Sequence, residues 1–281
     1  CIMHDRLLMR MPTGIPSLDP VLDGGVPPGS VVLLLGEHGA GNVEFVQTSL
    51  MHLTRLKRAG QTGGERLLVP PSISYVTITR MREDILREVA LSFNPDLYDQ
   101  LGEGILFHDL SEFYFDASIV PPGWYGAGTV MERLQKKQRR EGGGILAELA
   151  GVLKVLPEDG LIVLDSLTDI TPSLAEGEDW HTFIAFLRGL QRAAKNWNCT
   201  IFLLLASGIL DRSRELEIAD CVDATFIFQW EESGAQRRQR VMYFGKFRGV
   251  MTRLEDKNLV KFAVSISAKG GFEVRNIRMV V

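Results

Sequence analysis

Residues 36–43 have the types and spacing expected of a phosphate-binding loop. The stretch Gly36-Glu37-His38-Gly39-Ala40-Gly41-Asn42-Val43 follows the apolar run 31–35 and precedes a helical pattern. Backbone N–H groups of a glycine-rich turn, together with the N-terminus of the following helix, can bind phosphate oxygens without any side chain. We therefore predict that the nucleotide-binding residues of this chain run from Gly36 to Val43.

The side chains of this loop depart from the P-loop template. Its glycine spacing fits, but the template continues with Lys and then Ser or Thr, where this sequence has Asn42 and Val43. The template lysine contacts the γ-phosphate and the hydroxyl binds magnesium. Glu37 would repel phosphate, and His38 would help only when protonated. The sequence therefore predicts a backbone cradle that binds ATP with Mg²⁺ weakly or not at all.

Asp165 is the second candidate for this chemistry. It ends the apolar run 160–164, which is typical of a parallel strand buried on both faces. Open α/β sheets bind ligands at the carboxyl ends of such strands. An aspartate at this place alone is most simply a helix cap. Because a glycine loop follows an earlier strand, we predict instead that Asp165 is the Mg²⁺ ligand of the site, if any metal is bound.

The elements that must position these residues alternate along the chain. Apolar and β-branched runs predict strands at 31–35, 74–79, 104–107, 160–166, 200–205, 224–230, 238–247 and a hairpin over 261–275 that turns at 269–271. Helical periodicity predicts helices after residue 42, at 85–93, 145–156 and 180–197. This order predicts the α/β class, with a central, mostly parallel sheet flanked by helices and C-terminal antiparallel strands.

Residues 111–144 break this alternation. Aromatic residues and the stretch 121–123 (Pro-Pro-Gly) precede a basic helical stretch at 136–140, which ends in three glycines. Long loops in compact domains are usually functional or disordered. We predict one domain over residues 1–281, with 111–144 as a flexible insertion. An arm that binds a partner or nucleic acid is the alternative.

Composition narrows the class of protein. The chain has 281 residues, is 45% hydrophobic and carries a formal charge of −4, which argues against DNA as its main partner. Cys1, Cys199 and Cys221 form no CxxC pair, so we expect no zinc or disulfide framework and a reducing, cytoplasmic location. No apolar run approaches the roughly 18 residues of a membrane helix. Because the sequence begins with Cys1, we leave open whether residues precede it.

Four further stretches of sequence carry a family resemblance. They are the opening stretches 13–19 (TGIPSLD) and 24–30 (GGVPPGS), the run 164–167 (LDSL) and the run 246–249 (KFRG). Together they resemble the KaiC-like and RadA-like branch of the RecA superfamily of P-loop ATPases. The resemblance implies a RecA-like P-loop NTPase core, ring or other oligomeric assembly, and ATP bound between subunits.

The resemblance also assigns roles to two cations near the C-terminus. It implies that Lys246 and Arg248 reach the nucleotide of a neighbouring subunit. The implied partner is another copy of the chain or a catalytically competent KaiC-like relative. The alternative is that the cations of 237–253 merely protect an exposed edge strand.

The departures from the family pattern define the functional prediction. The family's lysine falls on Asn42, its threonine on Val43, and its paired catalytic glutamates on Thr79 and Arg80. With the Walker A motif degenerate, we predict no catalytic residue and a pseudo-ATPase with a regulatory or scaffolding role, as in signal transduction. One alternative is a slow ATPase that uses Asp165 for magnesium and another carboxylate as base. The other is a RadA-paralogue-like accessory protein in DNA recombination.

Overall fold

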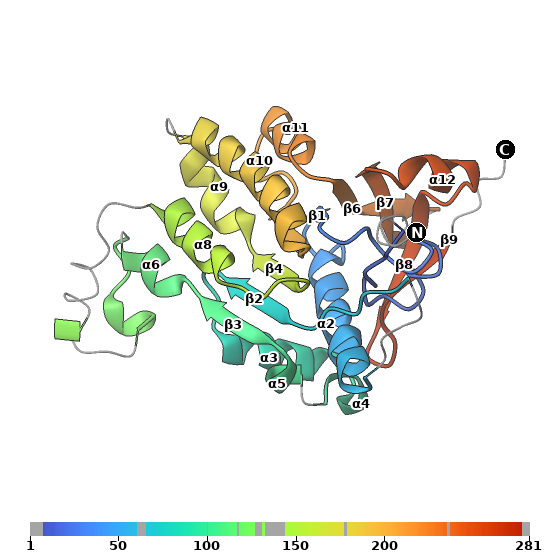
Figure 1. The fold of residues 1–281 in the computed structure, drawn as a ribbon, viewed down its shortest axis with the longest axis horizontal. Helices are drawn as coiled ribbons and strands as arrows, with labels where there is room; N and C mark the ends of the chain where they lie inside the picture. Colours follow the sequence, from blue (N-terminus) through green and yellow to red (C-terminus); the bar gives the residue numbers. More distant parts are fainter. Residues whose placement is uncertain are drawn as a thin grey trace.

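A mixed sheet organises the part of the chain that the computed structural model describes, namely residues 8–60, 66–99, 101–116, 118–126, 131–132, 144–176, 179–234 and 237–276. The sheet has nine strands in the order β3-β2-β4-β5-β1-β6-β7-β8-β9 (Figure 1). Their bounds are β1 Val31–Gly36, β2 Ile73–Thr77, β3 Leu106–Asp109, β4 Leu161–Asp165, β5 Thr200–Ala206, β6 Ala224–Ser233, β7 Arg237–Phe247, β8 Lys261–Ser267 and β9 Gly271–Asn276.

The sheet has a parallel part and an antiparallel part. From β3 to β6 in the spatial order, neighbouring strands run parallel. The strands β7, β8 and β9 then continue it in antiparallel fashion. Every residue of β1 is buried, as expected for a parallel strand covered on both faces. The predicted α/β fold class is confirmed.

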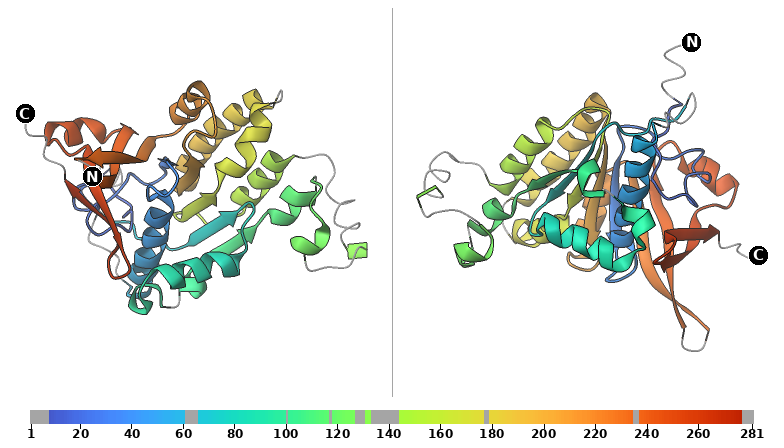
Figure 2. Two further views of the ribbon diagram at one scale, coloured as in Figure 1. Left: turned by 180° about the vertical axis from the view of Figure 1, so that it is seen from behind. Right: turned by 90° about the horizontal axis from the view of Figure 1, so that it is seen from below.

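Helices cover both faces of the sheet, as the two further views show (Figure 2). Their bounds are α2 Asn42–Arg58, α3 Arg82–Ser92, α4 Pro95–Tyr98, α5 Leu101–Gly104, α6 Ser111–Asp116, α8 Ile145–Lys154, α9 Leu167–Ala175, α10 Trp180–Trp197, α11 Arg212–Asp220 and α12 Met251–Asp256, with a 3-10 turn at Pro122–Trp124. Alternate residues of β1 point into two separate cores. One core lies under α2 and α3, and the other lies under α8, α9, α10 and α11.

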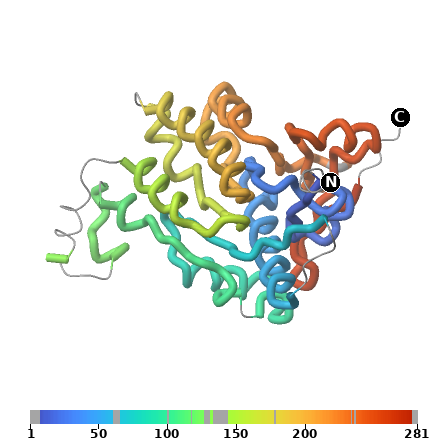
Figure 3. The backbone as a smooth tube through the Cα atoms, in the orientation of Figure 1, coloured from blue at the N-terminus to red at the C-terminus, as the bar shows by residue number. Residues whose placement is uncertain are grey.

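The first core joins the start of the chain to its end. Met11 and Ile15 share it with Phe262 and Phe272 of the last hairpin. The tube in Figure 3 shows this proximity of the blue N-terminal segment and the red C-terminal strands. At its centre, the ring of Phe45 lies 5.3 Å from that of Phe272. It also lies 5.5 Å from Phe228. Since Phe45 is in the first turn of α2, these contacts fix the helix start, and with it the glycine loop.

Some predicted elements are wrong in detail. The third strand starts at Leu106 rather than 104, because 101–104 form the short helix α5. The helices α4, α9, α11 and α12 were not predicted either. Within 111–144, α6 is a helix rather than irregular chain, and the hydroxyl of Tyr114 donates to the Asp169 carbonyl at 3.0 Å. The predicted basic stretch 136–140 lies outside the described residues.

Among the helices in the described ranges, none is both long enough and apolar enough to cross a membrane.

Candidate functional site

A cavity of about 280 Å³ lies where β1 and β4 end, and it brings the glycine loop and Asp165 together. It is lined by Gly36, Glu37, His38, Gly39, Asn42, Val43, Glu44, Glu88, Asp165, Ser166, Thr168, Leu204, Leu205 and Ala206. Two residues of the predicted loop, Ala40 and Gly41, shape it without lining the cavity. Ala40 is fully buried, and a Cβ at Gly41 would lie 3.1 Å from the ring of Phe272.

The sheet topology explains why these residues meet. The strand β5 lies between β1 and β4, and all three run parallel. Gly36 at the end of β1 is level with Ala206 at the end of β5. The carboxyl ends of parallel strands share one edge of the sheet, so residues far apart in the sequence gather there.

The backbone of the loop has the geometry of a phosphate cradle. Gly39 and Gly41 have φ angles of 72° and 114°, which residues with a Cβ rarely adopt. The N–H of Ala40 donates to the Glu37 carbonyl at 2.9 Å and closes the turn. Within the described part of the chain, the N–H groups of His38, Gly39 and Gly41 have no hydrogen-bond partner. These donors remain available to an anion.

The strands β6 and β7 hold the outer side of the loop. The indole N–H of Trp230 donates to the His38 carbonyl at 3.1 Å. The Nε of Arg240 donates to the Gly39 carbonyl at 2.9 Å, and its guanidinium lies 4.5 Å from the Trp230 ring centre. The backbone N–H of Trp230 donates to a Glu37 carboxylate oxygen at 3.2 Å. The Glu37 carboxylate is therefore engaged by β6.

Asn42 is folded back onto the strand instead of extending along the loop. Its Nδ2 donates to the Leu34 carbonyl at 3.4 Å, and its Oδ1 accepts the N–H of Val43 at 3.1 Å. The side chain packs on Gly36, where a Cβ would lie 2.5 Å from the Asn42 Cγ. One backbone donor of the cradle, the Val43 N–H, is thus occupied by the side chain that replaces the template lysine.

Asp165 lies at the edge of the cavity with a neutral partner. The phenol of Tyr75, on the adjacent strand β2, donates to its Oδ2 at 2.5 Å. Burial raises the pKa of Asp165 above its ordinary value, against the lowering effects of Tyr75 and Arg80. The same burial raises the pKa of Tyr75, to which the charge of Asp165 adds. The surroundings therefore disfavour the charged form of this carboxylate.

Glu88 is a cavity residue that the sequence did not reveal. It comes from α3, and each of its carboxylate oxygens is engaged. The amide of Gln47 on α2 donates to Oε1 at 3.1 Å, and Arg80 forms an ion pair with Oε2. No local pattern in α3 distinguishes Glu88 from its neighbours.

Comparison with known proteins supports the architecture. No protein-family profile matches this chain, and no curated protein sequence matches it. A KaiC-like protein of the hyperthermophilic archaeon Pyrococcus horikoshii has a similar structure, with a TM-score of 0.60 and 18% sequence identity. The similarity covers 95% of this chain and 99% of that protein. The chain has a KaiC-like fold. At this identity the likeness does not extend to activity.

The side chain of Lys246 contacts the C-terminal end of helix α11 in the KaiC-like fold. Its Nζ donates to the carbonyls of Ala219 and Asp220, at 3.2 and 3.1 Å, in the last turn of α11. Cations stabilise this end of a helix dipole. Burial lowers the pKa of Lys246, and the nearby charge of Arg248 lowers it further. The side chain therefore contacts its own chain rather than the cavity.

Arg248 lies at the opposite end of the KaiC-like sheet from the loop. Its N–H donates to the carbonyl of Asp223, whose own N–H donates to the carbonyl of Val31 at the start of β1. From Val31 to Gly36, the strand β1 extends about 17 Å. Arg248 follows β7 rather than belonging to it, so Lys246 and Arg248 do not lie on one face of a strand.

The position of β7 in the sheet bears on the alternative explanation, in which the cations protect an exposed edge strand. An exposed edge would account for its cations, but β7 lies between β6 and β8, and the edges of the described sheet are β3 and β9. Only the segment Arg240–Tyr243 of β7 pairs with β8. The parts of β7 that carry Arg237, Arg238 and Lys246 lie outside this pairing, so the alternative stays open.

The residues present fit the phosphates of ATP only in part. The unpaired N–H groups of the loop fit an oxyanion. The side chains do not, because the cavity is lined by Glu37, Glu44, Glu88 and Asp165 and by no lysine or arginine among the described residues. Nor do the described residues contain any group of three or more His, Cys, Asp or Glu that could hold a metal ion. Asp165 alone would be a poor magnesium site.

Proposed function

We propose that this chain is a KaiC-like pseudo-ATPase, a regulatory or scaffolding subunit that binds ATP weakly or not at all. The observation that carries the proposal is the conformation of Asn42. At the position of the phosphate-binding lysine stands a short amide that bonds to Leu34 and to the Val43 N–H. It offers no positive charge to a phosphate, and it removes one backbone donor from the cradle.

The charge of the cavity supports weak binding. Four carboxylate side chains line it, with no lysine or arginine among the described lining residues. At about 5 Å and an effective dielectric constant of about 20, one carboxylate opposes a unit negative charge by about 3 kcal/mol. Glu37 and Glu44 supply this repulsion, because Glu88 is paired with Arg80 and the surroundings of Asp165 disfavour its charge. The backbone donors that remain are each worth only about 1.5–3 kcal/mol toward a charged group.

The absence of hydrolysis is supported by a second set of residues. The paired glutamates of the family fall on Thr79 and Arg80. The Thr79 hydroxyl donates to Asp169 at 3.3 Å, and Arg80 pairs with Glu88. Neither can accept a proton from an attacking water. Because phosphoryl transfer depends on positioning and electrostatics, losing base, lysine and hydroxyl together leaves little catalysis.

The test is a calorimetric titration with ATP and Mg²⁺ beside a phosphate-release assay. We expect phosphate release at background and a dissociation constant in the millimolar range or no detectable heat. Asp165→Ala serves as the internal control, since it should not change a background rate. Clear magnesium-dependent turnover that disappears in Asp165→Ala would contradict the proposal.

One observation favours a second candidate, a slow ATPase. Glu88 and Asp165 line the same cavity, so a carboxylate base and a magnesium ligand could both face a bound nucleotide. In this case Glu88→Gln should abolish a slow release that the unchanged protein shows. The pairing of both Glu88 oxygens with Gln47 and Arg80 makes this candidate the weaker one.

We also propose that the chain associates with another copy or with a competent KaiC-like relative. Arg248, with a side chain 61% exposed, and Lys246 lie away from the loop of their own chain. A role for these cations at a phosphate therefore requires a neighbour. Light scattering across a concentration series, with and without ATP, should show association that Lys246→Ala/Arg248→Ala weakens. A strictly monomeric protein that engages no relative and is indifferent to the double substitution would contradict this.

A further inference from the structure

The loop cavity has carboxylates in its wall, and the cation that compensates them lies outside the lining. The described lining includes Glu88 and Asp165 but no lysine or arginine. Arg80, which does not line the cavity, forms an ion pair with Glu88. The negative charge of this wall is therefore balanced from within the chain.

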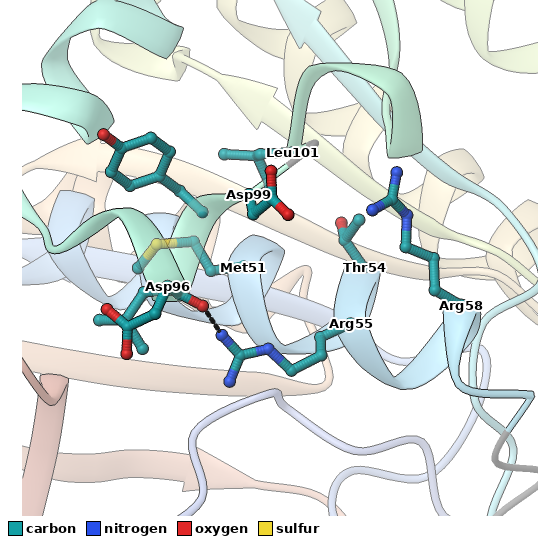
Figure 4. A pocket seen from close by; sticks show the side chains of 9 residues that line it. Met51, Thr54, Arg55, Arg58, Asp96, Asp99 and Leu101 are labelled. Atoms are coloured by element: carbon teal, nitrogen blue, oxygen red, sulfur yellow. Dashed lines mark hydrogen bonds between the residues drawn. The ribbon is translucent and has the colours of Figure 1, made fainter.

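A second cavity, of about 350 Å³, shows a different arrangement (Figure 4). It lies between the C-terminal half of α2 and the short helices α4 and α5, and residues of both charges line it, namely Arg55, Arg58, Asp96 and Asp99. Arg55 donates to the Asp96 carbonyl, as the dashed line in Figure 4 marks. Arg58 pairs with Glu103. In that cavity the cations belong to the wall, whereas in the loop cavity the cation stands behind it.

The backbone fixes Arg80 near Asp165. The strands β2 and β4 are neighbours, and Thr77 is level with Asp165 in their register. The N–H of Ile78 donates to the Asp165 carbonyl at 2.8 Å. The Thr77 hydroxyl donates to the Arg80 carbonyl at 2.9 Å and accepts the Arg80 N–H at 3.1 Å, which closes the turn after β2. Arg80 is therefore held at the same edge of the sheet as Asp165.

The guanidinium of Arg80 serves two carboxylates. It pairs with one oxygen of Glu88, whose other oxygen accepts a hydrogen bond from the Gln47 amide at 3.1 Å. Its charge also reaches Asp165, because burial raises the pKa of that carboxyl whereas the hydrogen bond from Tyr75 and the charge of Arg80 lower it. One fixed cation thus compensates two carboxylates that face the same cavity.

A divalent cation at these carboxylates would compete with the guanidinium. Mg²⁺ is usually bound by one or two carboxylates together with water molecules. Glu88 and Asp165 could supply such a pair, but the ion would have to displace Arg80 from Glu88. It would also meet the positive charge of Arg80, and like charges in a partly buried site repel more strongly than in water. The wall of the cavity suits a metal ion, and the residue behind it opposes one.

We propose that the guanidinium of Arg80 takes the place of a divalent cation at this cavity, so that Glu88 and Asp165 bind no Mg²⁺ in the folded chain. Arg80 thereby sets the metal selectivity of the cavity from outside its lining. This role of Arg80 goes beyond the proposed function, because it concerns the metal alone and is independent of the affinity for ATP.

The first experiment titrates the full chain with Mn²⁺, which takes the same oxygen ligands as Mg²⁺, and follows the free ion by electron paramagnetic resonance. No nucleotide is present, and the original chain should show no saturable binding. Arg188→Met is the matched control, because it removes the same charge from an exposed ion pair with Asp220. Arg80→Met should bind Mn²⁺ at least about tenfold more tightly than this control does. Equal binding by the two variants overturns the proposal.

The second experiment measures thermal unfolding with and without Mn²⁺. The ion should raise the melting temperature of Arg80→Met and leave that of the original chain unchanged. In Arg80→Met/Glu88→Gln the rise should be lost, because one of the two carboxylates is gone. An equal rise in the single and the double variant would place the ion elsewhere and overturn the proposal. A rise in the original chain that Glu88→Gln removes would overturn it as well, and this comparison requires no Arg80 variant to fold.

Discussion

Two aspartates at opposite ends of the central sheet have different surroundings. Asp223, before β6, is 5% exposed and accepts hydrogen bonds from the Lys195 ammonium at 2.8 Å and the Val31 N–H at 2.8 Å. The amide of Gln191 donates to it as well, at 3.0 Å. Asp165, after β4, has the neutral phenol of Tyr75 as its hydrogen-bond donor, and burial raises its pKa.

The difference indicates two roles: Asp223 stabilises the fold, whereas Asp165 belongs to the candidate site. Asp223 ties the start of β1 to α10 and has its charge compensated by a cation. Asp165 is held in a place that disfavours its charge, so its ionised form does not stabilise the fold. A residue that opposes stability in this way is typical of a ligand site, whether active or inherited. The following predictions test this contrast, from the largest effect to the smallest.

Asp223→Ala should lower the free energy of unfolding by about 3 kcal/mol or more. It leaves the N–H of Val31 without its acceptor and the ammonium of Lys195 without its partner. Urea denaturation followed by circular dichroism measures the change. Asp220→Ala is the control, since that surface carboxylate pairs with the exposed Arg188 and should matter little. Equal effects of the two substitutions would show that Asp223 does not stabilise the fold more than an exposed carboxylate does.

Asn42→Lys with Val43→Thr should tighten the binding of ATP with Mg²⁺ by at least about tenfold, or about 1.4 kcal/mol. The lysine adds a charge, and the loss of the Asn42 carboxamide frees the backbone N–H at position 43. Calorimetric titration measures the affinity. Asn42→Ala separates the two causes, because it frees the N–H without adding a charge. If the double variant binds no better than the original chain, the cavity is closed to nucleotide for another reason.

Asp165→Asn should change how stability depends on pH. The folded protein holds the Asp165 proton more tightly than the unfolded chain, because burial raises the pKa above its ordinary value of 3.8. The stability that this group contributes is fully present below about 3.8 and is lost as pH rises through the folded pKa. The unfolding free energy of the original chain, minus that of the variant, should therefore fall as pH rises from 4.

Urea titrations at a series of pH values measure that difference. Asp19, whose pKa is raised by burial to about 6, is present in both proteins and cancels from it. A difference that stays flat or rises with pH would show that the surroundings of Asp165 favour its charge.

Lys246→Met should lower the free energy of unfolding by no more than about 1 kcal/mol. The substitution removes donors from the last carbonyls of α11 but keeps most of the hydrocarbon chain. Chemical denaturation measures this change in the free energy of unfolding. Lys257→Met is the control, because Lys257 is an exposed cation at the C-terminal end of α12. A loss of unfolding free energy as large as that of Asp223→Ala would show that Lys246 is also required for the stability of the fold.

The sequence predicted those parts of the molecule that depend on local patterns. The apolar runs identified β1 and β4, and helical periodicity located α10 at 180–197, as observed. Because ends of parallel strands share an edge, the meeting of the glycine loop with Asp165 could also be anticipated. The helix α11 was missed because its residues are mostly polar and bury only Ile218. The helix α9 contains Pro172, which opposes a helix assignment.

Other parts of the site could not be read from local pattern. The contacts of Trp230 and Arg240 with the loop depend on the register between β6 and β7, in which these two residues are directly paired. Glu88 enters the cavity because α3 packs beside α2, where Gln47 meets it. These are long-range relations, and no pattern within one segment specifies them.

The packing of Phe45 against Phe272 has a consequence for biosynthesis. The first turn of α2 is completed by a residue near the end of the described chain, and the Phe272 N–H also donates to the Thr48 hydroxyl at 2.8 Å. Such contacts span more than two hundred residues, and closing them is slow. While the chain is still on the ribosome, the glycine loop lacks one wall of its support. The conformation of the loop therefore becomes fixed only after the last hairpin has been synthesised.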